Sequence, residues 1–248
     1  MSFKDHFSAR AALYATYRPG YPDSLFSHLA TLPLSRQVAC DCATGNGQAA
    51  RGLIEHFTRV IAMDASQSQL SHAGRSEGVN YVAAGAEAFP LRARSVDIVT
   101  VAQALHWLEL EQFYGEVRRV LVPRGVCAVW GYGDPVLDDA KLHEAVHRFN
   151  RVTIESYWAP ERMSLLEGYA TIPFPFREVA QPAFTLECNW TLAELVGYLR
   201  TWSATAAYAA DRRVDPVIEV EAELATIWGP PDAKKTLRWP LFLRVGYA

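Results

Sequence analysis

Short apolar runs alternate with longer amphipathic stretches in the first half of the chain, from residue 37 to about residue 132. Continuous apolar runs, such as that at 96–102, are typical of strands that are covered on both faces. The amphipathic stretches between them predict helices. This alternation favours a parallel sheet with helices on both faces. The predicted strands are 37–42, 58–63, 79–83, 96–102 and 125–131, and the predicted helices are 48–57, 66–75 and 109–121.

The pattern changes after residue 134, where amphipathic stretches predominate. Before residue 37, the chain predicts helices that are interrupted by the proline-containing segment 17–22. The elements predicted after residue 134 are a helix over 137–157, a loop rich in proline and aromatic residues over 158–176, a strand over 177–188, helices over 192–209 and 216–228, and a strand over 237–247.

A turn of small residues follows the first predicted strand. The segment 38–48 reads VACDCATGNGQ, and its two glycines let a ligand approach the bare backbone. The N–H groups at the start of the next helix have no partner within that helix and point toward such a ligand. The second strand ends on Asp64, whose carboxylate is placed to accept two hydrogen bonds from a ribose diol. The two features together predict a site for a nucleotide-type cofactor.

Two cofactor classes fit this site, dinucleotides and S-adenosylmethionine. A dinucleotide places its pyrophosphate on the helix N-terminus, and the sequence pattern typical of its site is G-x-G-x-x-G. Here the turn has Ala43, Gly45 and Gly47, and no third glycine follows at the expected offset. Asp41 would repel a pyrophosphate, whereas it suits an ammonium or a sulfonium group. S-adenosylmethionine is therefore favoured, and an NAD(P)-dependent oxidoreductase is the alternative.

The turn and the later acid resemble the first two motifs of class I S-adenosylmethionine-dependent methyltransferases. The resemblance implies that the turn, Asp64 and Ala65 contact the cofactor. The family usually has glycine where this chain has Ala43, and we expect that side chain to crowd the methionine end of the cofactor slightly. The segment 84–91 resembles the family's adenine-reading segment and implies contacts from Ala86 and Glu87. The family's usual Asp is replaced there by glycine, so the Ala86 N–H is the expected contact to adenine.

Three further segments are similar to trans-aconitate methyltransferases. Residues 17–22 read YRPGYP and match the YRPxYP segment of that subfamily, which implies that Tyr17 and Arg18 contact the cofactor. Arg18 offers a forked donor for the methionine carboxylate, and the prolines stiffen a loop suited to a lid. Residues 103–107 read QALHW, resemble Q-A-x-H-W-F and follow the fourth strand, where such a sheet binds its ligands. Residues 199–204 resemble the helix beside that subfamily's substrate pocket.

The resemblance implies a small organic acid that is methylated on a carboxylate oxygen. Gln103 and His106 are expected beside the cofactor. His106 would orient a carboxylate, which needs no base, or would act as the base toward a hydroxyl or amine acceptor. Aromatic side chains are expected to wall the substrate or the sulfonium, and arginines such as Arg151 and Arg162 are candidates to hold the acid. The predicted substrate residues are Tyr14, Trp107, Trp158, Arg200 and Trp202.

The expected fold is the class I methyltransferase fold, a three-layer, Rossmann-like α/β fold with a mostly parallel seven-stranded sheet and a helical cap. Within it, residues 1–36 are predicted to form an N-terminal helical lid and residues 37–134 the cofactor-binding core. Residues 135–248 are predicted to form a helical substrate cap together with the last strand pair of the sheet.

Composition and charge limit the kinds of partner that this protein is expected to bind. The chain has 248 residues and a net charge of −3, so it lacks the basic surface that holds a nucleic acid through its phosphates. It contains neither an apolar run long enough for a membrane span nor the apolar core of a signal peptide. Its four cysteines form no disulfide-like framework. We therefore expect a cytoplasmic enzyme, monomer or homodimer, that acts on a small molecule and needs no metal.

One motif points to different chemistry. Residues 143–147 read HEAVH and match H-E-x-x-H, in which two histidines one turn apart bind zinc beside a catalytic glutamate. A third ligand is needed, and only Glu161 or Glu167, on a proline-containing stretch, is nominally available. The predicted helix also follows a complete nucleotide-type core. A zinc hydrolase that uses His143 and His147 is therefore the less favoured alternative, and a solvated helix face is the better account.

Overall fold

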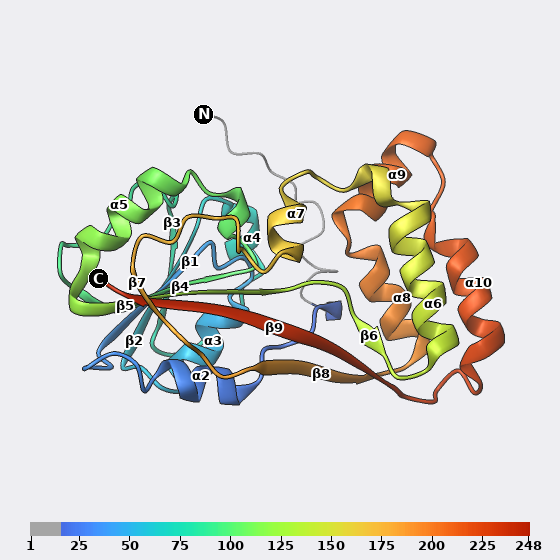
Figure 1. The fold of residues 1–248 in the computed structure, drawn as a ribbon, viewed down its shortest axis with the longest axis horizontal. Helices are drawn as coiled ribbons and strands as arrows, with labels where there is room; N and C mark the ends of the chain where they lie inside the picture. The colour runs from blue at the N-terminus through green and yellow to red at the C-terminus, as the bar shows by residue number, and fades with distance from the viewer. Residues whose placement is uncertain (1–15) are drawn as a thin grey trace.

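The computed structural model describes residues 16–248. The predicted substrate residue Tyr14 lies outside the described residues. One sheet runs through the molecule in the order β3-β2-β1-β4-β5-β9-β6, and β7 and β8 also pair with β9 (Figure 1). The strands are β1 Val38–Cys42, β2 Arg59–Asp64, β3 Val79–Ala83, β4 Val96–Ala102, β5 Leu121–Tyr132, β6 Val136–Leu137, β7 Arg177–Val179, β8 Phe184–Trp190 and β9 Lys235–Tyr247.

Strands β1 to β5 are parallel to one another. Strand β9 pairs antiparallel with β5, β6, β7 and β8. The predicted Rossmann-like, mostly parallel sheet is therefore confirmed. Its seven long strands are those from β1 to β5 together with β8 and β9, and the two short strands β6 and β7 extend it. Because parallel strands share one direction, the carboxyl ends of β1 to β5 meet at the same edge.

Helices cover both faces of the sheet, so the fold has three layers, with the sheet between two layers of helices. Helices α2 (Asp23–Leu29) and α3 (Gln48–Ile54) pack on one face, and α5 (Leu110–Val120) packs on the other. β5 shows the alternation, since Ala128 faces the α2 and α3 side while Cys127 and Val129 face α5. Burial on both faces explains why these strands read as continuous apolar runs.

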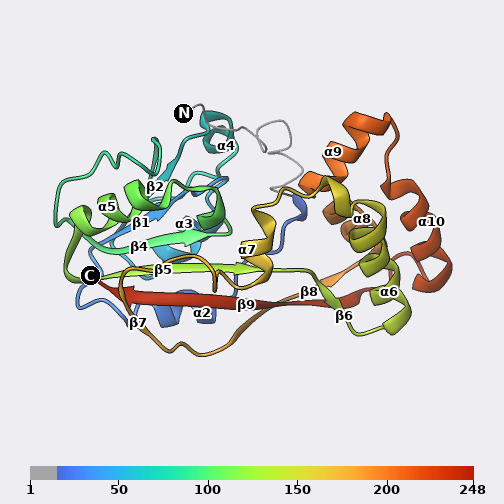
Figure 2. The same cartoon turned by 45° about the horizontal axis from the view of Figure 1, so that its top comes forward.

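Four helices gather beyond one end of the parallel strands, where the long β9 carries the sheet past the core (Figure 1). The short helix α7 (Arg162–Leu166) lies between this group and the core (Figure 2). Across the described residues, no helix is long and apolar enough to cross a membrane. The four helices are α6 Ala140–Arg148, α8 Leu192–Arg200, α9 Ser203–Arg212 and α10 Val217–Trp228.

Element boundaries after residue 134 differ from those predicted. The helix predicted over 137–157 begins only at α6, because the Asp139 side chain caps it by accepting the N–H groups of Lys141 and Leu142. Its last part is a π-helical turn over Phe149–Thr153 and a 3₁₀ turn over Glu155–Tyr157.

Two further predicted elements are split, and one predicted loop contains a helix. The strand predicted over 177–188 divides into β7 and β8 around Pro182, which has no N–H for the ladder. The helix predicted over 192–209 divides into α8 and α9, because Trp202 takes an extended conformation between them. The predicted loop over 158–176 contains α7.

Candidate active site

The candidate site lies at the carboxyl edge of the parallel strands. β1 has β2 on one side and β4 on the other, so the direction in which the chain adds strands reverses between β1 and β4. Ligands of open α/β sheets bind in the crevice at such a reversal. The turn after β1, Asp64 at the end of β2, the segment after β3 and Gln103 after β4 are therefore brought to one edge, as the spacing predicts.

The backbone of the turn after β1 requires small residues. Ala43, Gly45 and Gly47 all have positive φ angles, of 54°, 57° and 80°. Among residues 16–248, a Cβ at Gly45 would have only the Gln69 Oε1 atom within reach, at 4.0 Å, so these residues leave one side of the turn open. A Cβ at Gly47 would instead lie 2.4 Å from the Tyr81 hydroxyl. The chain accepts an alanine in the left-handed region only at the first of these positions.

Asp64 joins the end of β2 to this turn. Its Oδ2 accepts the Gly45 N–H at 2.8 Å, and its Oδ1 accepts the Ser66 N–H at 2.7 Å. The residue is 8% exposed. A carboxylate can accept hydrogen bonds from several donors, and the contact of Asp64 to the ribose hydroxyls stays a prediction. Ala65, beside it, is exposed at the same edge.

Asp41 lies behind the turn, at 1% exposure. Its carboxylate accepts the hydroxyl of Thr44 at 2.5 Å and the hydroxyl of Thr100 at 2.8 Å. Burial raises the pKa of Asp41 to about 6, against the opposing effect of these two hydrogen bonds. The structure therefore ties Asp41 to the turn and to β4 and leaves it almost no surface for the direct cofactor contact that was predicted.

Gln69 is a candidate that sequence reasoning missed. Ser66 caps helix α4 (Gln67–Ser71) by accepting the Gln69 N–H, and the Gln69 side chain is buried at 6% exposure. Within residues 16–248, the Gln69 Oε1 atom has no hydrogen-bond partner. Buried acceptors normally have a hydrogen-bond partner, so this atom is suited to accept a hydrogen bond from a ligand bound beside the turn. The only signal in the sequence is a glutamine on the inward face of a helix that follows Asp64.

The segment after β3 completes this part of the edge. Ala86 is buried at 7% exposure, whereas Glu87 is exposed and folds its carboxylate back toward Gly85. The Ala84 N–H donates to the carbonyl of Asp64 at 2.9 Å, which holds the segment against the end of β2. The predicted adenine contacts of Ala86 and Glu87 stay predictions.

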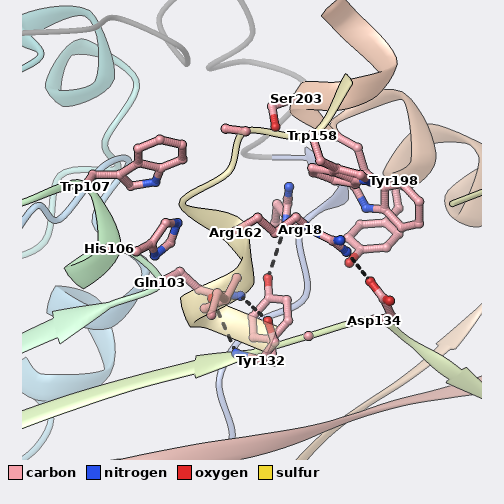
Figure 3. Close-up of a pocket in the computed structure, with 14 residues that line it drawn as sticks. Arg18, Gln103, His106, Trp107, Tyr132, Asp134, Trp158, Arg162, Tyr198 and Ser203 are labelled. Atoms are coloured by element: carbon pink, nitrogen blue, oxygen red, sulfur yellow. Dashed lines mark hydrogen bonds and ion pairs between the residues drawn. The ribbon is translucent and has the colours of Figure 1, made fainter. Parts of the chain in front are cut away.

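A pocket of about 90 Å³ opens beyond the ends of β4 and β5. Figure 3 shows the Arg18 and Arg162 side chains near its centre, between His106 on one side and Trp158 on the other. It is walled mainly by rings from the core and from the helical part of the chain. The lining residues are Arg18, Gln103, His106, Trp107, Tyr132, Gly133, Asp134, Trp158, Ala159, Arg162, Leu165, Tyr198, Trp202 and Ser203.

His106 stands on a 3₁₀ turn after β4. Its Nδ1 lies 2.9 Å from the Tyr169 hydroxyl, and its ring centroid lies 4.7 Å from that of Trp107. Burial lowers the pKa of His106 to about 4, and the nearby Glu161 only partly opposes this. The imidazole is therefore neutral at neutral pH.

Gln103 locks the ends of two strands together. Its Nε2 donates to the Tyr132 carbonyl at 3.1 Å, and its Oε1 accepts the Tyr132 N–H at 3.3 Å. Its φ of 58° is in the left-handed region, which is uncommon for a residue other than glycine and is often found at functional sites. Gln103 therefore shapes the pocket floor between β4 and β5.

Two guanidinium groups and one carboxylate set the charge of the pocket. The Arg18 Nη1 donates to the Tyr132 hydroxyl at 3.5 Å, and its guanidinium carbon lies 5.3 Å from the Tyr198 ring centroid. Arg162 forms an ion pair with Asp134 and stacks on Trp158 at 3.9 Å. Among the described lining residues, the charged side chains are therefore Arg18, Arg162 and Asp134.

Several predicted residues do not reach the pocket. Arg200 forms ion pairs with Asp215 at 2.9 Å and Glu221 at 2.8 Å and is absent from the lining. Arg151 likewise pairs with Asp134, at 2.9 Å. The Tyr17 ring packs against Gly197 of α8, and its predicted contact to the cofactor stays a prediction. By contrast, the predicted Trp107, Trp158 and Trp202 do meet in the lining.

The H-E-x-x-H segment forms no metal site in the described part of the chain. His143 and His147 lie on α6 with their ring centroids 6.2 Å apart. No group of three or more potential ligand residues occurs anywhere between residues 16 and 248. The His143 Nδ1 instead accepts the Leu137 N–H at 3.4 Å. The zinc-hydrolase alternative thus has no third ligand among these residues.

Fold and site together define an α/β enzyme with a nucleotide-type cofactor site that adjoins an aromatic pocket. The residues fit S-adenosylmethionine, since an open backbone at Gly45, the Asp64 carboxylate and the Gln69 amide oxygen meet at one edge.

Comparisons with known proteins agree with this class. The model of the methyltransferase domain family matches residues 40–129. A "putative methyltransferase" of Dictyostelium discoideum is 31% identical over 95% of this chain and 90% of that protein. A "probable S-adenosylmethionine-dependent methyltransferase" of Saccharomyces cerevisiae is 30% identical over 52% of this chain and 47% of that protein. The solved structure of a "putative type II methyltransferase" from Anaeromyxobacter dehalogenans is 38% identical, with a TM-score of 0.87 over 93% of this chain and 98% of that one.

The chain belongs to the class I S-adenosylmethionine-dependent methyltransferases. The predictions of this enzyme class, of its fold and of its cofactor are therefore confirmed, and the NAD(P)-dependent alternative is wrong. The comparisons support the class and not the narrower trans-aconitate subfamily.

Proposed function

We propose that this methyltransferase methylates a carboxylate oxygen of a small organic acid, as its resemblance to trans-aconitate methyltransferases implies. One observation carries the proposal. The Arg162 guanidinium and the His106 ring line the same aromatic-walled pocket, and that pocket begins at the ends of the strands that frame the cofactor site. Planar guanidinium groups are suited to hold carboxylates through paired hydrogen bonds.

The chemistry requires alignment more than proton transfer. S-adenosylmethionine supplies a methyl group that its sulfonium already activates. A carboxylate acceptor is already anionic, so the chain needs to orient it and to exclude water, and orientation of this kind supplies much of a rate enhancement. Arg162 is pre-positioned by Asp134 and Trp158, and its five N–H donors exceed what Asp134 engages. In this proposal Arg18, closer to the N-terminal segment, holds the methionine carboxylate of the cofactor.

The rings that surround these groups provide the walls. Trp107, Trp158 and Trp202 line the pocket from three separate segments of the chain, and in this proposal they exclude water from the acceptor. In this proposal residues 1–36, of which 1–15 lie outside the described residues, act as the lid and residues 135–248 as the substrate cap. The lining supports this division, since it joins Arg18 to residues of α7 and α8.

A panel of acceptors tests the proposal. The enzyme is incubated with S-adenosylmethionine and with matched series of small acids, their alcohols and their amines. We expect S-adenosylhomocysteine to form only with free acids, and the product to release methanol on treatment with alkali, as a methyl ester does. Arg162→Met should raise KM for the acid while the affinity for S-adenosylhomocysteine is unchanged. Transfer to alcohols or amines, with a product stable to alkali, would overturn the carboxylate assignment.

A further inference from the structure

Tyr169 is a buried tyrosine whose hydroxyl reaches the candidate active site from behind. It follows α7, has 0% exposure, and places its hydroxyl 2.9 Å from the His106 Nδ1. Its ring packs edge-on against Phe242, with centroids 4.9 Å apart. Tyr169 is absent from the pocket lining, and its hydroxyl meets the lining at His106.

The direction of this hydrogen bond follows from where the hydroxyl proton can go. A buried O–H group needs an acceptor. Among residues 16–248, the only acceptor within reach of the Tyr169 hydroxyl is the His106 Nδ1. If the His106 Nδ1 carried the proton instead, the buried Tyr169 O–H would be left without an acceptor among these residues. The Tyr169 hydroxyl is therefore the donor, and the His106 Nδ1 is the acceptor.

We propose that Tyr169 is a positioning residue that holds His106 in the tautomer with its proton on Nε2. A neutral imidazole carries one proton, so an Nδ1 that accepts leaves Nε2 as the donor. Because His106 lines the pocket and its Nδ1 faces Tyr169, Nε2 is the nitrogen that a bound acceptor meets. His106 then donates a hydrogen bond to the acceptor oxygen, a role that rests on the proposed carboxylate function.

The surrounding structure holds Tyr169 in an uncommon backbone conformation. Gly168 and Tyr169 have φ angles of 64° and 59°, in the left-handed region that bulky residues seldom adopt. Arg244 donates from Nη1 to the carbonyls of Tyr169 at 2.7 Å and Ile172 at 2.8 Å. Conformations of this kind persist where neighbouring contacts over-determine them, often at functional sites. The hydroxyl is thus held in place from the last strand, β9.

The tautomer can be read directly by NMR without any substrate. The protein is labelled with ¹⁵N-histidine, and His106→Gln identifies the His106 signals among those of the seven histidines. In the wild type we expect an Nδ1 shift typical of an acceptor nitrogen and a proton on Nε2. In Tyr169→Phe we expect the two tautomers to mix, with kcat/KM lowered about tenfold, the effect of one lost hydrogen bond. Tyr114→Phe is the matched control.

Tyr114 suits this control because it is buried at 4% exposure in the same apolar cluster, and within the described part of the chain its hydroxyl has no partner. Its loss should leave both the spectrum and kcat/KM unchanged. A wild-type proton on Nδ1, or an unchanged His106 spectrum in Tyr169→Phe, would overturn the inference. If Tyr169→Phe does not fold, the wild-type spectrum alone decides. An Nε2 proton found together with a non-carboxylate acceptor would refute the proposed function and leave the tautomer assignment standing.

Discussion

The Gly45 N–H donates to the Asp64 Oδ2 at 2.8 Å, so the acid expected to hold the ribose also holds the turn that the cofactor must approach. The two residues are brought together by neighbouring parallel strands, β1 and β2. Cofactor affinity and the shape of the turn are therefore coupled through one carboxylate.

Replacement of Asp64 tests this coupling. Asp64→Asn keeps the size of the side chain but loses the charge and one acceptor oxygen. Charged hydrogen bonds contribute about 1.5–3 kcal/mol, so we expect Kd for S-adenosylhomocysteine to rise about 10- to 100-fold. Isothermal titration calorimetry measures this directly. The exposed Asp138, which pairs with Arg238, provides the control Asp138→Asn. Equal affinity in both variants would remove Asp64 from the cofactor site.

The glycine turn makes a prediction about stability. Gly47→Ala puts a Cβ in the left-handed region and 2.4 Å from the Tyr81 hydroxyl, so we expect the free energy of unfolding to fall by at least about 1 kcal/mol. Gly115→Ala is the matched control, since Gly115 lies within α5 with open space around it and should gain up to about 1 kcal/mol. Urea unfolding compares the two. A Gly47 variant as stable as the wild type would contradict the turn geometry.

The buried Asp41 predicts a pH dependence of stability. Its pKa is raised by burial from 3.8 to about 6 in the folded state, so the folded protein binds more protons than the unfolded chain between these values. Stability from this group is therefore greatest below about pH 4 and is lost as the pH rises through about 6. Asp41→Asn removes that loss. The difference in unfolding free energy between wild type and variant should change with pH across this window, by at most about 1.4 kcal/mol per pH unit. A constant difference would contradict the raised pKa.

His106 predicts the shape of the pH–rate profile. Because burial lowers its pKa to about 4, it stays neutral down to about pH 5 and should contribute no acid limb near pH 6.5. In the orienting role, His106→Gln retains a donor and much of kcat, whereas His106→Ala should lose about tenfold, the effect of one hydrogen bond. Initial rates from pH 5 to 8 measure both. A steep acid limb in the wild type that disappears in His106→Gln, with a large loss of rate, would identify His106 as a base.

Local features of the sequence were sufficient to place the glycine turn and Asp64 at the same edge of the sheet. The turn with Gly45 and Gly47 and the acid at Asp64 follow directly from strands whose apolar runs show their ends. Parallel strands then bring these ends to one edge, whatever the detailed packing. For the same reason the core elements from β1 to β5 lie close to their predicted bounds, whereas the boundaries after residue 134 shifted at Asp139, Pro182 and Trp202.

The substrate half depended on contacts between distant segments, which only the tertiary structure decided. Arg151, Arg162 and Arg200 are equivalent as sequence, but acidic partners hold Arg200 against Asp215 and Glu221 and leave Arg162 at the pocket. Tyr169 lies 63 residues from His106 and carries no motif. A side chain's orientation and protonation are set by the groups that pack around it, and those groups come from elements that the sequence does not place next to one another.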